Sequence, residues 1–325
     1  MRPLLIACLA GLLARSALAA EPVSVAPGVD LIPGAFVPNT QPDGNSVVFT
    51  TSQGLVVIDS GRHVEHTQRI LDAATAANLP ISAVVNTHWH LDHVSGNPRL
   101  RAAYPQIKVY ASDAIDAAMS GFLADYRKQL VSASGASKDE KQLAAWRAEI
   151  ATIDAGRALY PDIVVARTGR FRIAGEDFTL HLVGPAATAG DVWLFAPKSR
   201  VLVAGDLVTL PVPFLDTACP AAWKSALAEL QRVDFQTLVP GHGAPMRPAQ
   251  FETWRHAYDH FVDCGASARD GKACVDGWLA DAQPLLAGAD PAFVRSLATY
   301  YVDNSLRAPK ASIDKLCAPP AQARQ

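Results

Sequence analysis

Beyond its first twenty residues, the sequence lacks any run of about 20 consecutive apolar residues, the length that a membrane-spanning helix needs. We therefore expect no membrane span. The sequence also lacks an excess of charge of either sign, because 29 Lys and Arg stand against 31 Asp and Glu. No basic stripe interrupts this balance, so a nucleic-acid partner is not expected.

The first nineteen residues have the pattern of a secretory signal peptide. Arg2 supplies the positive start, residues 4–13 form the apolar middle, and Ala17-Leu18-Ala19 is a small-x-small cleavage site. A buried N-terminal helix is the alternative, but the cleavage triplet falls where processing needs it. We expect residues 1–19 to be removed and the mature protein to be periplasmic or secreted.

Cysteine is scarce, with five residues in the chain, of which Cys8 lies in the expected signal peptide. Four remain in the mature chain, and an even number in an oxidising compartment favours two disulfides. Three pairings are possible. We favour Cys264–Cys274, which closes a short loop, and Cys219–Cys317, which ties down the C-terminal tail; free buried thiols are the alternative. None of the four has the spacing of a metal site or a redox dithiol.

Apolar, β-branched runs alternate with helical patterns through most of the mature chain. The expected strands cover residues 46–50, 54–59, 81–87, 108–111, 162–167, 171–174, 178–183, 191–196, 201–204 and 237–239. The expected helices cover residues 63–77, 113–131, 138–155, 220–231 and 248–264. Helical material divides the strands into two sets, which predicts two sheets.

This order of elements also predicts the domain organisation. A main domain is expected over residues 20–250, with a helical insertion at about 113–157. A helical, cysteine-containing extension packed on it is expected over residues 251–325.

The most informative stretch is His88-Trp89-His90-Leu91-Asp92-His93, which carries four metal-competent side chains directly after an apolar run. In extended backbone, His88, His90 and Asp92 would project to the same side and converge, while His93 turns toward a second point. Imidazole and carboxylate ligands together suit zinc or a similar cation. Solvated loop histidines are the alternative, but so dense a motif favours a metal when ligands follow later in the chain.

Two later strands supply such ligands. Asp206 follows the apolar run 201–204, and His242 stands between Gly241 and Gly243. The neighbouring glycines allow tight turns and close approach of the backbone. A Gly-Asp pair after a strand is weak evidence alone, but the combination in this order is strong.

With these motifs and the strand that ends in Val57-Ile58-Asp59-Ser60-Gly61, the chain resembles the metallo-β-lactamase superfamily from about residue 45 to 246. The resemblance implies an α+β fold, a four-layer αβ/βα sandwich with a metal site at one edge of the sheets. It places His88 and His90 in a first metal site. It places Asp92, His93 and His242 in a second, with Asp206 bridging the two or bound to one. Asp59 would orient the histidine-rich loop.

One departure from the family pattern affects the first site. Where the family reads Gly-His-Thr-x-Gly-Asp, residues 186–191 read Ala-Ala-Thr-Ala-Gly-Asp, so Ala187 stands in place of the third histidine. The first site keeps two imidazoles, with Asp206 as a further candidate, against the three protein ligands usual for catalytic zinc. Its metal affinity should fall accordingly.

Other histidines offer no clear replacement. His63 is the best placed, although a solvent-facing position at a helix N-terminus is the favoured interpretation. His181 is expected to lie too far away. His256 and His260 share one helical face, for which we favour a solvated or packing role.

These observations predict a metal-dependent hydrolase that acts on an ester, thioester or lactam-like bond of a small-molecule substrate. Zinc would activate the attacking water, and Asp92 or Asp206 would accept its proton. We expect one or two Zn²⁺ ions, with one favoured, because the second site keeps two histidines and a carboxylate. The alternative is a non-catalytic binding protein of the same fold. Ala187 argues for it, and the retained ligands argue against it.

Two neighbouring features bear on the substrate. Residues 207–216 are either the wall of a pocket for a partly apolar substrate or a loop packed on the inserted helices. Trp89 is expected to pack under the histidine-rich loop.

Overall fold

The computed structural model of the chain describes residues 21–35 and 41–318. The expected signal peptide lies outside the described residues. Among the helices that are described, none is both long enough and apolar enough to cross a membrane.

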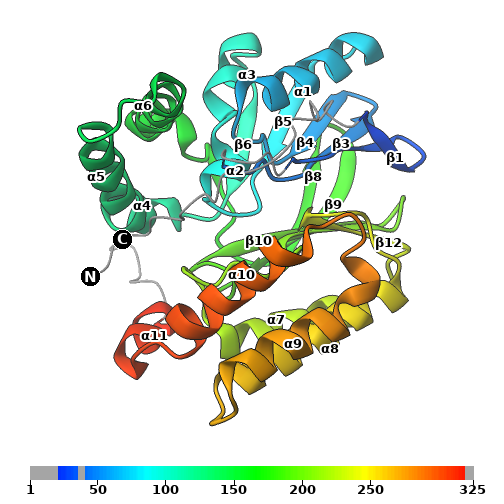
Figure 1. Cartoon of the computed structure of the whole chain (residues 1–325). Helices are drawn as coiled ribbons and strands as arrows, with labels where there is room; N and C mark the ends of the chain where they lie inside the picture. Colours follow the sequence, from blue (N-terminus) through cyan, green and yellow to red (C-terminus); the bar gives the residue numbers. More distant parts are fainter. Residues whose placement is uncertain (1–20, 36–40, 319–325) are drawn as a thin grey trace.

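Two β-sheets lie face to face in the centre of the molecule (Figure 1). The first sheet has the order β1-β2-β3-β4-β5-β6-β7, antiparallel from β1 to β4 and parallel from β4 to β7. Its strands are β1 (Val23–Ala26), β2 (Val29–Ile32), β3 (Ser46–Thr51), β4 (Gly54–Ile58), β5 (Ile81–Val85), β6 (Lys108–Ala111) and β7 (Ile163–Val164).

The second sheet has the order β12-β11-β10-β9-β8, in which β11 and β12 are parallel and the other neighbours antiparallel. Its strands are β8 (Gly169–Ile173), β9 (Glu176–Val183), β10 (Asp191–Ala196), β11 (Val201–Thr209) and β12 (Thr237–His242). The two predicted sheets are therefore present. However, β7 pairs with β6 in the first sheet, so the division between sheets follows β7 and not the helical insertion.

Helices cover the outer face of each sheet. The first sheet is covered by α1 (Val64–Ala77) and α3 (Asn97–Ala103), and the second by α7 (Pro220–Gln231) and α8 (Pro248–Gly265) (Figure 1). This is the predicted four-layer αβ/βα sandwich. Pro220 and Pro248 each stand in the first turn of their helix, where a missing N–H costs no hydrogen bond.

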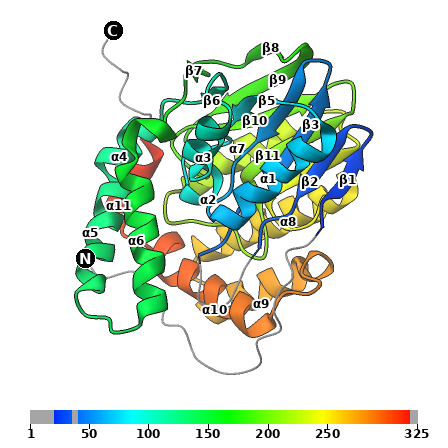
Figure 2. The ribbon, with the colours of Figure 1, turned by 90° about the horizontal axis from the view of Figure 1, so that it is seen from above.

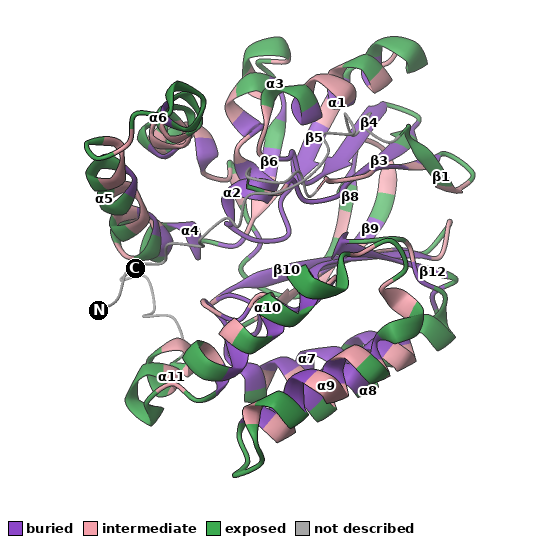
Figure 3. Cartoon of the chain, in the orientation of Figure 1, coloured by how far each residue is buried: buried purple, intermediate pink, exposed green. Residues whose placement is uncertain are grey.

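The apolar core lies in three layers between these elements. The inner faces of the two sheets meet in one cluster, where Phe49 of β3 and Phe178 of β9 pack edge to face at 5.2 Å between ring centroids. A second cluster lies between the first sheet and its helices, and a third between the second sheet and its helices. In Figure 3 the central strands β4 and β10 are almost wholly buried, whereas β1 and β8 at the sheet edges are mostly intermediate or exposed.

The expected insertion forms three helices beside the sandwich: α4 (Ile115–Ser120), α5 (Phe122–Ser134) and α6 (Glu140–Asp154), followed by the short η1 (Gly156–Leu159) (Figure 2). The single helix expected over residues 113–131 is two helices, because the backbone of Gly121 leaves the helical region, with φ −111° and ψ −103°. Asp139 caps α6 by accepting hydrogen bonds from the backbone of Lys141 and Gln142.

The C-terminal part of the chain is helical. It contains α9 (Gly271–Asp281), η2 (Gln283–Leu285), α10 (Pro291–Tyr301), the π-helical turn η3 (Val302–Leu306) and α11 (Lys310–Cys317). The expected start of the extension at residue 251 falls inside α8. The apolar residues of 207–216 belong to the same core cluster as these C-terminal helices, rather than to the cluster formed by the inserted ones. The indole N–H groups of Trp254 and Trp278 donate to the carbonyls of Thr209 and Pro211.

Before the C-terminal part of the chain, five short elements match none of the predicted strands and helices: β1, β2, α2 (Leu91–Val94), α3 and η1. Each has seven residues or fewer, so none carries enough periods of an apolar pattern to be recognised.

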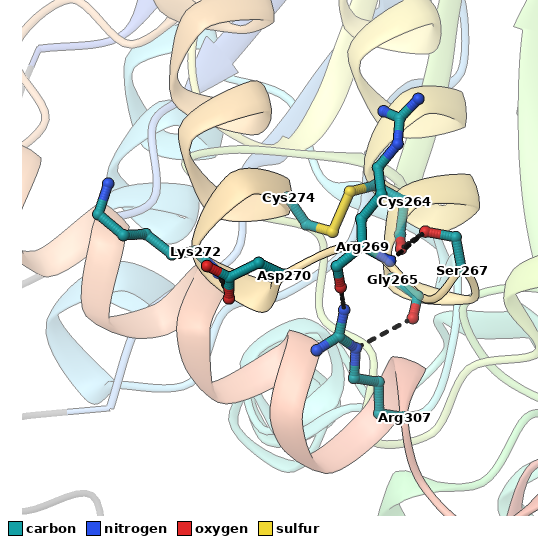
Figure 4. Close-up of a disulfide and its surroundings, with 8 residues drawn as sticks. All are labelled: Cys264, Gly265, Ser267, Arg269, Asp270, Lys272, Cys274 and Arg307. Carbon is teal, nitrogen blue, oxygen red and sulfur yellow. Dashed lines mark hydrogen bonds between the residues drawn. A yellow bond between two sulfur atoms is a disulfide. The ribbon is translucent and has the colours of Figure 1, made fainter.

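Both predicted disulfides are present. Cys264–Cys274 joins α8 to α9, and Cys219–Cys317 joins the start of α7 to the end of α11. Beside the Cys264–Cys274 disulfide, Arg307 donates hydrogen bonds to the backbone carbonyls of Gly265 and Arg269 (Figure 4). Two disulfides are typical of a protein from an oxidising compartment.

The two disulfides should contribute unequally to stability because they close loops of different length. The paired cysteines are 98 and 10 residues apart, so loop closure predicts losses of about 5 and about 3 kcal/mol on removal. Urea unfolding of Cys219→Ser/Cys317→Ser and Cys264→Ser/Cys274→Ser should show the larger loss in the former. An equal or reversed ranking would contradict this account.

His66 provides a pH-dependent contribution to folding. It is buried in the first turn of α1, where its Nε2 lies 2.8 Å from the hydroxyl of Ser46 on β3. Burial lowers the pKa of His66 to about 4, against the opposing attraction of Asp43. An unfolded chain would protonate this imidazole near pH 6.5, so the folded state loses stability as the pH falls from 6.5 to 4.

We expect His66→Gln to remove this component, since an amide can keep the hydrogen bond to Ser46 but cannot take up a proton. Between pH 6.5 and 4, the wild-type free energy of unfolding should fall relative to the variant by about 3 kcal/mol. Urea unfolding at pH 7, 5.5 and 4.5 measures the difference. Parallel pH profiles for the two proteins would refute the assignment.

Candidate metal centre

The structure brings all six predicted ligands together at one edge of the two sheets. They come from the loop after β5, from α2, and from the ends of β11 and β12, and all are buried. They form two groups, within each of which the candidate ligand atoms lie within 4.8 Å of one another. The first contains His88, His90 and Asp206; the second contains Asp92, His93 and His242.

Asp92 does not converge with His88 and His90, as an extended backbone would have required. The chain turns into the short helix α2 at Leu91, which carries Asp92 away from the first group and sets it beside His93. The Nε2 of His242 lies 3.0 Å from Asp92 Oδ2. The expectation from strand alternation is wrong at this residue, whereas the grouping implied by the family resemblance matches the geometry.

Asp206 faces both groups. Its Oδ2 lies 3.6 Å from His88 Nε2, while its Oδ1 lies 3.4 Å from His93 Nε2 and 3.6 Å from His242 Nε2. The residue lies within β11 and not at its tip, because the strand continues beyond an irregularity at Gly205, where φ is 55°. Gly241 of β12 is required opposite, since a Cβ there would overlap Asp206 Oδ1.

Asp59 orients the histidines from behind. Its carboxylate accepts hydrogen bonds from the backbone N–H and the hydroxyl of Thr87, both at 2.7 Å, and from His93 Nδ1 at 2.8 Å. Because the Thr87 proton is used on Asp59, the Thr87 oxygen can accept from His88 Nδ1, 3.0 Å away. Both imidazoles are thereby held with Nε2 toward the centre, as is usual for histidines that bind metal.

Three polar atoms at the centre are buried without a hydrogen-bond partner among the described residues. They are His88 Nε2, His93 Nε2 and Asp206 Oδ1. Buried polar atoms without partners cost about 1–3 kcal/mol each, so their convergence needs a compensating interaction. A divalent cation can accept imidazole lone pairs and a carboxylate oxygen at once, and the donor set therefore fits zinc or a similar metal.

The charges of the centre favour the same conclusion. Burial alone would raise the pKa values of Asp92 and Asp206, but the neighbouring His93 and His242 hold both below their ordinary value. Burial lowers the pKa of His90 to about 4 and that of His88 well below 6.5, so both imidazoles are neutral at pH 7. Burial would also lower the pKa of His93, but Asp59, Asp206 and Asp92 raise it well above its ordinary value. A bound cation would displace the proton on His93.

The remaining histidines lie outside both groups. His63 caps α1, is partly exposed and lies 2.8 Å from Asp43 through its Nδ1. His181 stacks on Trp193 with 3.5 Å between ring centroids. His256 and His260 lie exposed on α8, where Asp281 of α9 completes a separate surface cluster.

Two features of the centre were not found in the sequence. The guanidinium of Arg62 lies 3.6 Å from Asp92 Oδ1 and 2.5 Å from Glu149 of α6, which connects the insertion to the second group. Gly44 donates its N–H to the carbonyl of Asp92 and has the His93 ring where a Cβ would stand. These partners are far apart in sequence and belong to no motif.

Trp89 is buried under the histidine-rich loop, as expected. Its ring packs 5.5 Å from that of Phe122 at the start of α5.

Comparison with known proteins agrees with the fold. Among curated proteins, the chain is 25% identical over 219 residues to a linear primary-alkylsulfatase of Pseudomonas sp., a match that covers 60% of this chain and 40% of the relative. A segment of 43 residues is 51% identical to a hydroxyacylglutathione hydrolase of Gloeobacter violaceus, covering 13% of this chain and 17% of that protein. The chain thus spans less than half the length of these relatives.

Solved structures show the same architecture. A metallo-beta-lactamase from Pontibacter korlensis superposes with a TM-score of 0.52 at 22% identity, over 71% of this chain and 95% of that one. A sec-alkyl sulfatase superposes with a TM-score of 0.54 at 18% identity, over 76% of this chain and 42% of that one. A model of the family described as the Metallo-beta-lactamase superfamily matches residues 39–242. The chain belongs to the metallo-β-lactamase superfamily.

Proposed function

We propose that this chain is an exported, zinc-dependent hydrolase that acts on an ester, thioester or lactam-like bond of a small molecule. One zinc ion would be held tightly by Asp92, His93 and His242. The observation that carries the proposal is the convergence of buried His88 Nε2, His93 Nε2 and Asp206 Oδ1, which have no hydrogen-bond partner in the part of the chain that the structure describes.

The residues at the centre suit the hydrolysis of such a bond. When bound, zinc supplies a water molecule whose pKa is lowered toward about 7, so that hydroxide is available at neutral pH. Asp92 and Asp206 are ionised, so either can accept the proton that the attacking water gives up. Arg62 stabilises the ionised form of Asp92, and Glu149 balances the charge of Arg62. Trp89 and Leu91 enclose the loop on its apolar side.

Several observations support the separate parts of this proposal. Besides the alkylsulfatase, an atrochrysone carboxyl ACP thioesterase of Claviceps purpurea is 33% identical over 76 residues, covering 23% of this chain and 24% of that protein. Relatives of both kinds favour hydrolysis without fixing one bond. Export is supported by the two disulfides and by the signal-like pattern of the first nineteen residues. A single tight zinc is favoured because the second group keeps two imidazoles and a carboxylate, whereas the first has lost a histidine at Ala187.

Replacing one ligand of the second group should abolish hydrolysis. With zinc supplied, His242→Ala should lower kcat/KM at least about 100-fold on any active member of a chromogenic ester, thioester and lactam panel. His181→Ala is the matched control, because His181 stacks on Trp193 and belongs to neither ligand group. Equal activity of His242→Ala and wild type would refute metal catalysis. A fully inactive wild type would favour the non-catalytic alternative.

A further inference from the structure

Thr217 contacts the first ligand group at the point where the family histidine is missing. It lies between β11 and α7, and its Oγ1 lies 3.0 Å from His90 Nε2. The same oxygen lies 2.9 Å from the backbone carbonyl of Ala187 and donates to it. His90, Thr217 and Ala187 are all buried, so no bulk water competes for these bonds.

The hydroxyl proton can serve only one of these two contacts. Within the described chain, Thr217 is the hydrogen-bond donor to the carbonyl of Ala187. Turning the proton toward His90 would leave that carbonyl buried and unpaired, at a cost of about 1–3 kcal/mol. The Thr217 oxygen therefore accepts from Nε2–H of His90. In a neutral imidazole with a proton on Nε2, the lone pair is on Nδ1.

We propose that Thr217 compensates in part for the missing histidine by fixing His90 in the form that presents Nδ1 as a ligand. The first group then binds a divalent cation through two imidazoles and Asp206. This inference rests on the proposed metal-dependent function. His88, His90 and Asp206 are the candidates that the sequence left for this group, and together they make up the three protein ligands usual in catalytic zinc sites.

The C-terminal extension holds Thr217 in this position. On one side, Asp216 accepts hydrogen bonds from Ser305 at 3.1 Å and Tyr300 at 3.4 Å. On the other side, the N–H of Cys219 donates to the carbonyl of Ala186 at 2.8 Å, and its sulfur is bonded to Cys317. The backbone is therefore held on both sides of Thr217, which keeps the hydroxyl of Thr217 beside His90.

The cation at the first group should be the weaker of the two. Asp206 faces both groups, with Oδ2 toward His88 and Oδ1 toward His93, so its charge is shared when two ions are bound. The second group also has a carboxylate of its own, Asp92, whereas the carboxylate of the first group is the shared Asp206. A titration with metal should therefore show two binding steps, first at the group of Asp92, His93 and His242 and then at the group of His88, His90 and Asp206. Replacing Thr217 should affect only the second step.

Calorimetric titration of the metal-stripped full chain with Zn²⁺ tests the proposal. Thr217→Val removes the hydroxyl at nearly constant volume, and Thr217→Ser keeps it. We expect Thr217→Val to lower the Zn²⁺ affinity of the second binding step about 10- to 100-fold and to leave that of the first step unchanged. The affinities of Thr217→Ser should stay close to those of the wild type. Thr253→Val, which removes an exposed hydroxyl on α8, is the control.

The outcomes separate this inference from the proposed function. If wild type binds one ion tightly and Thr217→Val leaves the second step unchanged, or no second step exists, the role of Thr217 is wrong. If wild type binds no ion tightly, the proposed metal-dependent function is wrong as well.

A second measurement does not depend on the folding of a variant. Long-range ¹⁵N–¹H correlation spectra of the histidine side chains in metal-free wild type should show His90 protonated on Nε2 and not on Nδ1. The opposite tautomer would overturn the proposal, because Thr217 would then be donating to His90.

Discussion

The structure depends on one electrostatic constraint: buried carboxylates must be balanced at the edge where the two sheets meet. Asp206 stands between two groups of imidazoles, and each of its oxygens faces a different group. Without compensation, so much buried charge would be unstable. The parallel pair β11 and β12 brings Asp206 and His242 to this edge, and the loop after β5 brings the histidine-rich motif to it. The fold thus concentrates charge that a cation can balance.

Residues behind the ligands determine which nitrogen faces the centre. Asp59 accepts from His93 Nδ1, Thr87 lies 3.0 Å from His88 Nδ1, and Thr217 lies 3.0 Å from His90 Nε2. Parts of the chain outside the sandwich reach the same centre. The insertion contacts Asp92 through Glu149 and Arg62, and the C-terminal helices hold the segment that carries Thr217. The insertion and the C-terminal helices are therefore part of the support of the site.

The sequence predicted the elements and residues whose signals are local. Long apolar or amphipathic runs predicted most strands and helices, α7 to the residue, and the dense motif at residues 88–93 predicted side chains that converge in the two candidate groups. What it missed depends on tertiary contacts. Asp92 was first placed by strand alternation, but β5 ends at Val85 and the chain is helical from Leu91. Thr217 and His90 are 127 residues apart, and no local pattern indicates that their side chains meet. The short β1 pairs with β2, and β2 pairs with β3, so both strands depend on their neighbours in the sheet more than on their own composition.

The metal content of the purified mature protein tests the central claim most directly. Elemental analysis after growth with zinc and exhaustive dialysis should give one zinc per chain. Exchanging Asp92, His93 or His242 for alanine should reduce that content to near zero. A folded wild-type chain that retains no divalent metal after zinc is supplied would contradict the account, because the buried charge would then be balanced by protons alone.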